Sequence, residues 1–337
     1  MTTPPNVALE FTPRFALPEP HVRGEHGASL DEPDRRDGAA YDLIPSLHLA
    51  VEVALVTGRP LLLRGDPGSG KSALAPYVAR RLNWRYYEHV VTSQTEASDL
   101  LWRHDAIRRL ADAQVPGRLR PDHAYVEPGV LWWAFHRASA LHRGVRGGPP
   151  VPEPYGELNA GRDADHAVVL IDEIDKAHPD VPNGLLIALG SRRFEVPYLP
   201  EPVVSAHRLA PGPEVGSPLV VVTTNEERDL PAAFVRRCVT HRLDHPSPER
   251  LVEIARRHFD TTERPMTAAD ARLALALGER VEKLRDDTPA GGRKPSTAEF
   301  LDAFRACRAY GVRPDPTDAT WRLVEQLTLA KPEAGPW

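Results

Sequence analysis

The sequence predicts an α/β domain built on a parallel β-sheet with helices on both faces, followed by a smaller all-helical domain. Four short apolar runs alternate with helical stretches, at residues 60–64, 86–91, 167–171 and 219–223. Continuous apolar runs of this length are typical of parallel strands that are buried on both faces. Such runs stop after about residue 246, where helical patterns continue alone.

The composition is that of an ordinary globular protein. The 337 residues suffice for one large or two modest domains, and 26% of them are charged and 41% hydrophobic. The formal net charge of −5 provides no basic field that would attract nucleic acid or an anionic membrane, so we expect neither as a partner. The two cysteines, Cys238 and Cys307, indicate neither a disulfide framework nor a zinc site, and we expect both in or near a core.

Membrane-spanning and export signals are both missing from the sequence. No run of about 18 apolar residues occurs, and the N-terminus lacks the basic-then-apolar pattern of a signal peptide. We therefore expect a cytoplasmic protein.

Residues 1–38 form a proline-rich segment with little periodic apolar pattern, which we expect to be an extended or disordered arm. The alternative is a structured docking arm in which Phe11 and Phe15 anchor on a partner. From Tyr41 onward, apolar residues recur at helical spacing and predict an amphipathic helix. This helix opens the α/β domain, which we place at residues 39–245.

Two long interruptions separate the predicted strands, at about residues 107–165 and 192–218, and both are rich in proline. Loops of this length inside a compact domain are usually functional or partly disordered. Trp102 lies just before the first interruption, and Trp132 and Trp133 lie within it. These indoles could contact a partner or pack in the interior.

The helical domain is predicted at residues 246–331. Ser247 followed by proline is typical of a helix start. Thr267 with Asp270, and Ser296 with Glu299, have the spacing of capping boxes. Gly311 is placed to end the last of these helices.

The strongest chemical signal is a complete phosphate-loop motif that follows the first predicted strand. Its glycines let the backbone N–H groups surround phosphates, and the following helix, despite a proline at position 76 that should kink it or restrict its hydrogen bonding, adds its positive end. The lysine reaches the β and γ oxygens, and the last serine offers a hydroxyl to Mg²⁺. The motif therefore predicts that ATP and Mg²⁺ are the cofactors. Its residues are Gly65, Asp66, Pro67, Gly68, Ser69, Gly70, Lys71 and Ser72.

The third predicted strand delivers two adjacent carboxylates at its carboxyl end. That end is where ligands bind in open α/β sheets. We expect Asp172 to hold Mg²⁺ and Glu173 to orient and deprotonate the attacking water. The alternative is an acidic helix start, and we interpret Asp175 and Lys176 as charges of that kind.

Two further signals follow in the chain. Asn225 ends the fourth strand, where its amide could bond the attacking water and the γ-phosphate, although Asn is also a common turn residue. Arg236 and Arg237 end a predicted helix. They are either solvated helix-end charges or contain an arginine finger that reaches the γ-phosphate of a neighbouring subunit.

In this order the motifs resemble the AAA+ ATPases, and among them the MoxR-like family. The MoxR likeness rests on residues 171–177 (Ile-Asp-Glu-Ile-Asp-Lys-Ala), on residues 223–238 and on the long segments around the acidic strand. The resemblance covers about residues 41–329. It implies a P-loop NTPase parallel sheet, the AAA+ core, with a small helical lid domain.

The resemblance also implies residue roles. Arg237, with Arg236 beside it, would be the finger acting in trans, and Asn225 the sensing residue. The family usually has an arginine at the start of a lid helix; here the basic residues Arg293 and Lys294 precede the capping box, and either Lys294 or Arg293 would take the place of that arginine. By analogy, residues 41–45 border the adenine. The two interruptions would be a helical insertion and a hairpin insertion, which in related rings face the central pore or the partner.

The function implied is a ring, expected to be a hexamer, that couples Mg-ATP hydrolysis to remodelling or activation of a client protein. MoxR relatives commonly serve proteins with von Willebrand factor A domains. An alternative is a nucleotide-gated switch or assembly scaffold with little turnover, as in a defence-type system. A motor acting on DNA finds no support in the net charge.

Overall fold

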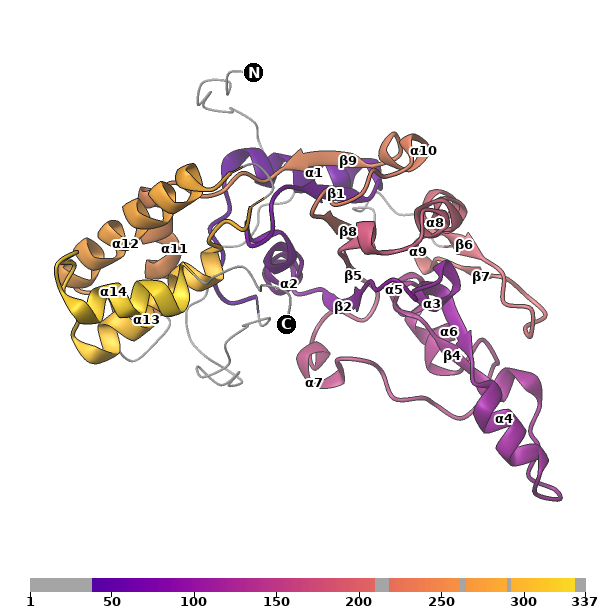
Figure 1. Ribbon diagram of the computed structural model, residues 1–337. Coiled ribbons are helices and arrows are strands. Elements are labelled where there is room, and N and C mark those ends of the chain that lie inside the picture. The colour runs from indigo at the N-terminus through magenta and orange to yellow at the C-terminus, as the bar shows by residue number, and fades with distance from the viewer. Residues whose placement is uncertain (1–37, 210–217, 261–264, 290–291, 331–337) are drawn as a thin grey trace. The chain divides into compact units, whose positions relative to one another are not determined.

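The computed structural model describes residues 38–209, 218–260, 265–289 and 292–330 (Figure 1). The predicted N-terminal arm lies outside these residues, apart from Gly38. The chain forms two compact units, which we describe separately. The sheet unit comprises Leu43–Arg64 and Val78–Arg242, and the lid unit comprises residues 38–42, Gly65–Tyr77 and the described residues from Leu243 onward.

The sheet unit is built on five parallel strands in the order β2-β5-β8-β1-β9. Their bounds are Leu61–Arg64 for β1, Arg85–Val90 for β2, Ala167–Asp172 for β5, Leu219–Thr224 for β8 and Val239–Arg242 for β9. The four predicted strands are confirmed within one or two residues. All five carboxyl ends lie at one edge because the strands are parallel.

Strand β9 has no counterpart in the predicted set. It occupies an edge of the sheet beside β1, and its four residues alternate between partly buried and exposed. An edge strand with polar and charged residues shows no apolar run, so the pattern used for the buried strands could not find it.

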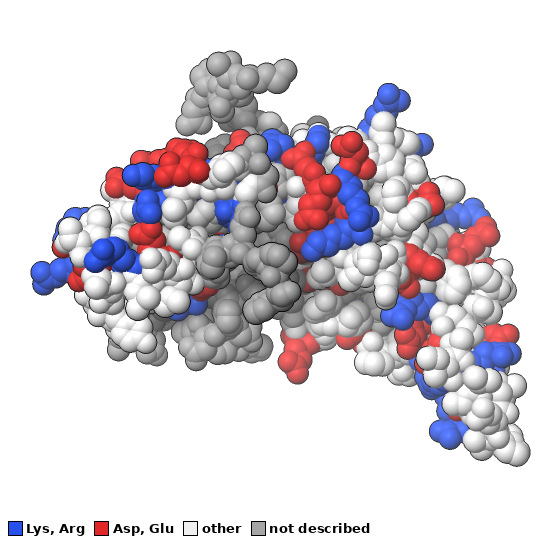
Figure 2. Space-filling view, viewed as in Figure 1, with Lys and Arg blue, Asp and Glu red and all other residues white. Residues whose placement is uncertain are grey.

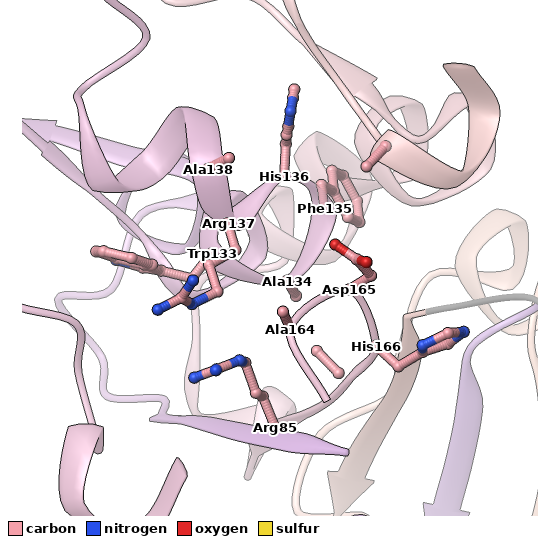
Figure 3. Close-up of a pocket in the computed structure, with 12 residues that line it drawn as sticks. Arg85, Trp133, Ala134, Phe135, His136, Arg137, Ala138, Ala164, Asp165 and His166 are labelled. Atoms are coloured by element: carbon pink, nitrogen blue, oxygen red, sulfur yellow. The ribbon is translucent and has the colours of Figure 1, made fainter. Parts of the chain in front are cut away.

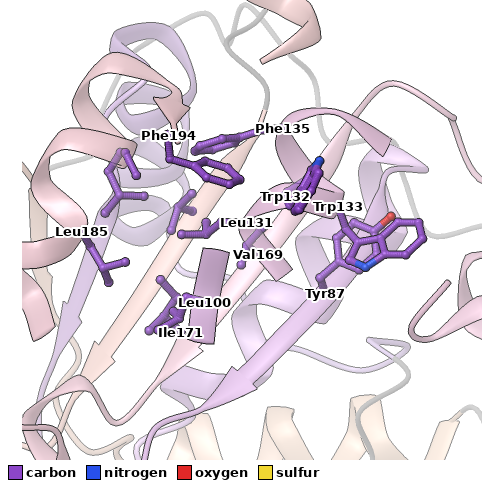
Figure 4. Close-up of a cluster of buried hydrophobic side chains, with 14 of the residues drawn as sticks. Tyr87, Leu100, Leu131, Trp132, Trp133, Phe135, Val169, Ile171, Leu185 and Phe194 are labelled. Atoms are coloured by element: carbon purple, nitrogen blue, oxygen red, sulfur yellow. The ribbon is translucent and has the colours of Figure 1, made fainter. Parts of the chain in front are cut away.

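Helices cover the sheet on both faces. Helix α1 (Pro45–Thr57) packs on β1 and β9, whereas α5 (Val130–Phe135) packs on β2 and β5. Side chains alternate along each strand, so Val169 and Ile171 of β5 enter the core cluster on the α5 side (Figure 4). The predicted α/β class, a parallel sheet with flanking helices, is confirmed.

The first interruption in the sequence is mostly structured. Trp132 and Trp133 lie on α5 with exposed fractions of 0% and 3%, so their packing role is confirmed, and Trp102 is half-buried. The antiparallel pair β3–β4 carries helix α4, which extends away from the sheet in Figure 1. The elements are α3 Ala97–Leu101, β3 Trp102–His104, α4 Ala106–Ala113, η1 Asp122–Tyr125, β4 Val126–Pro128, α5, α6 Arg137–Leu141 and α7 Gly156–Asn159.

The second interruption contains a short antiparallel pair and a short helix. Its elements are β6 Arg193–Phe194, β7 Val203–Val204 and α9 Ala206–Leu209. It is preceded by η2 Ile174–Lys176 and α8 Asp180–Ser191, and β8 is followed by α10 Ala232–Val235. The pairing agrees with the hairpin expected there, and residues 210–217 lie outside the described part.

The lid unit is helical after residue 246, as predicted. Both capping boxes are present, Thr267 with Asp270 and Ser296 with Glu299, and Gly311 ends α13 in the left-handed conformation. Phe300 and Phe304 lie in the core between the helices. The helices are α11 Pro248–Asp260, α12 Ala268–Asp287, α13 Thr297–Tyr310 and α14 Ala319–Thr328.

Helix α2 (Lys71–Leu82) follows the phosphate loop and contains Pro76. The helix runs without interruption through the proline, although a proline provides no N–H for the hydrogen bond of its turn.

None of the helices in the described ranges has both the length and the apolar character that a membrane span needs.

Candidate functional site

The acidic pair lies where strand β5 ends. Asp172 is the last residue of the strand and is only 5% exposed. Glu173 follows in the left-handed conformation, with φ 60° and ψ 50°. A glutamate rarely adopts this conformation, and such strain persists only where the surrounding contacts enforce it.

Thr223 of the neighbouring strand β8 binds both acidic residues. Its hydroxyl accepts a hydrogen bond from the Glu173 N–H (2.8 Å) and donates one to Oδ1 of Asp172 (2.6 Å). The side chain is fully buried. These two hydrogen bonds hold the backbone of Glu173 in its left-handed conformation.

The Glu173 carboxylate is held by two donors. Nδ2 of Asn225 donates to Oε1 (3.1 Å), and Nζ of Lys176 donates to Oε2 (2.6 Å). The hydrogen bond to Glu173 raises the pKa of Lys176. The structure thus brings together Asp172, Glu173 and Asn225, as predicted, and adds Lys176, for which the sequence predicts only a helix-start charge.

Asp175 is a site residue that the sequence did not reveal. It is 3% exposed, and its Oδ2 accepts hydrogen bonds from the backbone N–H groups of Asn225 (3.1 Å) and Glu227 (3.0 Å). A buried carboxylate that accepts two N–H bonds organises the loop that follows β8. Asp175 does lie in the first turn of η2, as interpreted from the sequence, but it is buried and binds the loop after β8.

The loop after β8 also joins three strand ends. Glu226 accepts hydrogen bonds from Arg64 at the end of β1 (2.6 Å) and from Arg242 at the end of β9 (2.5 Å). The three side chains are partly exposed, so the pairing contributes little to stability but orders this edge of the sheet.

Arg236 and Arg237 lie apart from the acidic cluster, just after α10. Both are exposed. Nη1 of Arg237 donates to the backbone oxygen of Ala233, one turn back (3.2 Å), and the backbone oxygen of Arg236 accepts from Arg59. An exposed guanidinium just after a short helix can reach a second molecule.

The phosphate loop belongs to the lid unit. Lys71 is 5% exposed and donates to the backbone oxygens of Gly65 and Asp66, both at 2.8 Å. Gly65 and Gly68 have φ of 140° and 74°, and a Cβ at either would collide with Leu243 or Ser296. Only glycine fits these two positions.

The start of lid helix α13 packs against this loop. The Thr297 N–H donates to the backbone oxygen of Gly68 (3.1 Å). Lys294 lies 3.7 Å from Oδ2 of Asp66, and Arg293 pairs with Glu299 instead. Of the two basic residues considered from the sequence, the structure places Lys294 beside the loop.

Two further lid residues, which no sequence motif marks, lie near Asp66. His245 lies 3.2 Å from Oδ2 of Asp66, and burial, with Arg285 and Lys294 nearby, lowers its pKa. Arg285 is 8% exposed, and burial lowers its pKa to about 10. Its guanidinium donates to the backbone oxygens of Pro246 and Pro295, while Nη2 has no hydrogen-bond partner among the described residues.

The donor chemistry of these residues fits Mg²⁺ and a triphosphate. Asp172 and Ser72 offer the oxygen ligands that Mg²⁺ prefers, and Lys71 provides a cation for phosphate oxygens. The buried hydroxyl of Ser69 in the loop has no partner among the described residues. Clusters of three or more His, Cys, Asp or Glu that could form an all-protein metal site are absent from the same residues.

A cavity of about 240 Å³ lies elsewhere in the sheet unit, at the amino ends of β2 and β5 (Figure 3). Arg85 and Arg137, which line it, both bind Glu153 (2.7 and 2.9 Å). The cavity is thus at the edge opposite the acidic pair.

On the face shown in Figure 2, the described basic side chains are interspersed with acidic ones and form no continuous stripe.

Comparisons with known proteins identify a family for the central part of the chain. Residues 60–238, just over half of the chain, match the model of the AAA domain (dynein-related subfamily). No curated protein matches the chain.

Two solved structures of RuvB from Thermotoga maritima show a weak likeness. An alanine-to-serine mutant is 15% identical with a TM-score of 0.45 and covers 83% of this chain and 67% of its own. A structure described as the RuvB Holliday junction branch migration motor is 17% identical with a TM-score of 0.35 and covers 82% of this chain and 70% of its own.

Proposed function

This chain belongs to the dynein-related subfamily of AAA domains, and we propose that it is a MoxR-like ATPase that remodels or activates a client protein. Members of the AAA+ class are P-loop NTPases. The finer assignment rests on the motifs at residues 171–177 and 223–238 and on the two long insertions.

The observation that carries the proposal is the arrangement of Glu173. Its carboxylate is held from one side by Asn225 and from the other by Lys176, at the end of a strand whose last residue is Asp172. A carboxylate in a fixed orientation beside a second one that can bind Mg²⁺ suits the activation of a water molecule. A protein that only bound nucleotide would need no such base.

We assign the remaining roles from chemistry. The backbone N–H groups of the loop, at residues 65, 66 and 68–70, and the Lys71 ammonium bind the phosphates. Ser72 and Asp172 hold Mg²⁺, which neutralises charge on the phosphate oxygens when bound. Glu173 accepts a proton from water, and Asn225 orients that water toward the γ-phosphate.

The chain acts as a homo-oligomer in this proposal, arranged as a ring of six. Arg237 supplies the γ-phosphate contact to the neighbouring subunit, with Arg236 beside it. The exposure of both residues supports a role outside their own subunit. Cations supplied in trans are effective because they stabilise the charge of the transition state only when the neighbour is in place.

The domain division proposed is an α/β domain at residues 39–245 and a lid at 246–331, with an arm before them. Lys294 is the proposed lid contact to the nucleotide, and its position beside Asp66 supports it. The buried Arg285 is a second cation near the same loop. The client is a protein, with a von Willebrand factor A domain as the leading candidate, and we place the complex in the cytoplasm.

Steady-state phosphate release from the wild type and from Glu173→Gln tests the proposal. We expect the substitution to abolish turnover while Mg-ATP binding persists, because the amide keeps the size of the side chain but cannot accept the proton. Equal rates in the two proteins would instead support the alternative, a nucleotide-gated switch or scaffold.

A further inference from the structure

The acidic segment and the loop after β8 hold each other through bonds that run in both directions. From β8, the Thr223 hydroxyl binds the Glu173 N–H (2.8 Å) and Oδ1 of Asp172 (2.6 Å). From the acidic segment, Oδ2 of Asp175 binds the N–H groups of Asn225 (3.1 Å) and Glu227 (3.0 Å). Four hydrogen bonds therefore fix two segments that lie about fifty residues apart in the sequence.

The side chains of Thr223 and Asp175 are both buried, which makes the loss of these hydrogen bonds costly. Thr223 is 0% exposed and Asp175 3%, so water does not replace a lost contact readily. A hydroxyl has one hydrogen, and that of Thr223 is committed to Asp172. The χ2 torsion of an aspartate is otherwise broad, so this bond selects one rotation of the carboxylate.

Asp175 fixes the position of Asn225, as Thr223 fixes the orientation of Asp172. Asn225 uses its backbone N–H to bind Asp175 and its Nδ2 to bind Glu173. The backbone bond thus fixes the point from which the side-chain amide reaches the carboxylate. Moving the loop would break the contact between Asn225 and Glu173.

We propose that Thr223 and Asp175 are positioning residues that lock the acidic pair and Asn225 into one arrangement. Thr223 sets the orientation of the carboxylate assigned to Mg²⁺, and Asp175 sets the distance from Asn225 to Glu173. The proposal rests on the function proposed above, because it deepens the account of the same site.

The test for Thr223 compares three variants by the Mg²⁺ concentration that gives half-maximal ATP hydrolysis. Thr223→Val keeps the shape but removes the hydroxyl, and we expect the requirement for Mg²⁺ to rise about 10–100-fold, the usual effect of removing a bond that orients a metal ligand. Thr223→Ser restores the hydroxyl and should recover most of the loss. Affinity for ATP in EDTA should stay near that of the wild type.

Thr224→Val is the matched control. Thr224 is the next residue of the strand, is 1% exposed, and its hydroxyl accepts from the Glu226 N–H (3.0 Å) rather than from the acidic pair. We expect it to lower the thermal unfolding temperature without the shift in Mg²⁺ requirement. Equal shifts in Thr223→Val and Thr224→Val, or no shift in Thr223→Val, would overturn the role of Thr223.

Asp175→Ala should change kcat and not the Mg²⁺ requirement. Because it releases the Asn225 loop and leaves Asp172 bound to Thr223, we expect kcat to fall about 10–100-fold while the Mg²⁺ requirement changes little. Asp175→Asn, which retains an acceptor for the two N–H groups, should recover part of kcat. A loss that appears only in stability and not in kcat would contradict the role of Asp175.

Amide hydrogen exchange in nucleotide-free protein separates this inference from the proposed function. Thr223→Val should speed exchange at the Glu173 amide, and Asp175→Ala at the amides of Asn225 and Glu227, relative to Thr224→Val. If the wild type failed to hydrolyse ATP but exchange at these amides became faster in the variants, the proposed function would be wrong and the positioning roles of Thr223 and Asp175 would hold. Unchanged exchange would refute the positioning roles themselves.

Discussion

Asn225 and Glu173 are joined across the carboxyl edge of the sheet: Nδ2 of the amide donates to Oε1 of the carboxylate over 3.1 Å. The two residues directly follow the neighbouring parallel strands β5 and β8, so the contact results from the pairing of these strands. It places a hydrogen-bond donor on the group that we assign as the base.

Asn225→Ala should lower kcat by about 10²–10³-fold, the usual loss when one preorganised donor is removed from a site. The Kd for Mg-ATP should change little, because the phosphate loop is intact. Phosphate-release kinetics and calorimetry on the same protein check both values. A normal kcat in this variant would show that the amide takes no part in the reaction.

Glu173→Gln should lower the pKa of Lys176 toward its ordinary value, because the bond to Glu173 is the main cause of its elevation. A raised lysine pKa contributes stability that is present below the unfolded-state pKa and lost as pH rises through the folded-state value. The stability difference between wild type and variant is therefore fully present at neutral pH and disappears at strongly alkaline pH, which is also where the two lysine titration curves differ. NMR titration of the lysine side chain measures it; identical titration curves would argue that the pair does not persist in solution.

Arg237→Ala should bind ATP but hydrolyse it about 10³-fold more slowly or worse, as expected for a lost finger. Mixing it with Glu173→Gln should partly restore hydrolysis, because some interfaces then combine an intact Arg237 with an intact Glu173. Arg236→Ala is the neighbouring control, and we expect a smaller loss. Co-assembled but inactive mixed oligomers would exclude an arginine acting in trans.

The two thiols should resist alkylation in the folded protein. Burial raises the pKa of Cys307 to about 11 and that of Cys238 to about 12. The reactive thiolate is therefore scarce at pH 8, and Cys307 is also 0% exposed. Iodoacetamide labelling read by mass spectrometry checks this, with Tyr310→Cys, at a position 80% exposed, as the reactive control. Rapid labelling of Cys307 without denaturant would contradict the packing of the lid core.

Local patterns in the sequence predicted much of this structure. The four buried strands and both capping boxes depend on residues close together in the chain, and each is present. Strand β9 escaped because an edge strand needs no apolar run. The sequence did not decide whether Trp132 packs in the core or contacts a partner, because tryptophan occurs in both environments.

The site was predicted only in part, because its supporting contacts are not local. The sequence identified Asp172 and Asn225 by their positions at strand ends. It could not show that Asp175 binds the loop after β8, since that contact spans about fifty residues. One signal was available: Ile174 beside it is apolar in an otherwise charged segment, and in the structure both residues are buried.

Calorimetry with Mg-ATP on nucleotide-stripped protein tests the central claim most directly. We predict binding to the wild type and at least about 30-fold weaker binding to Lys71→Ala, which removes a buried cation from the phosphate loop. A folded wild-type protein that gives no binding heat at any temperature tested, and that fails to protect its phosphate loop from proteolysis when Mg-ATP is added, would contradict the account.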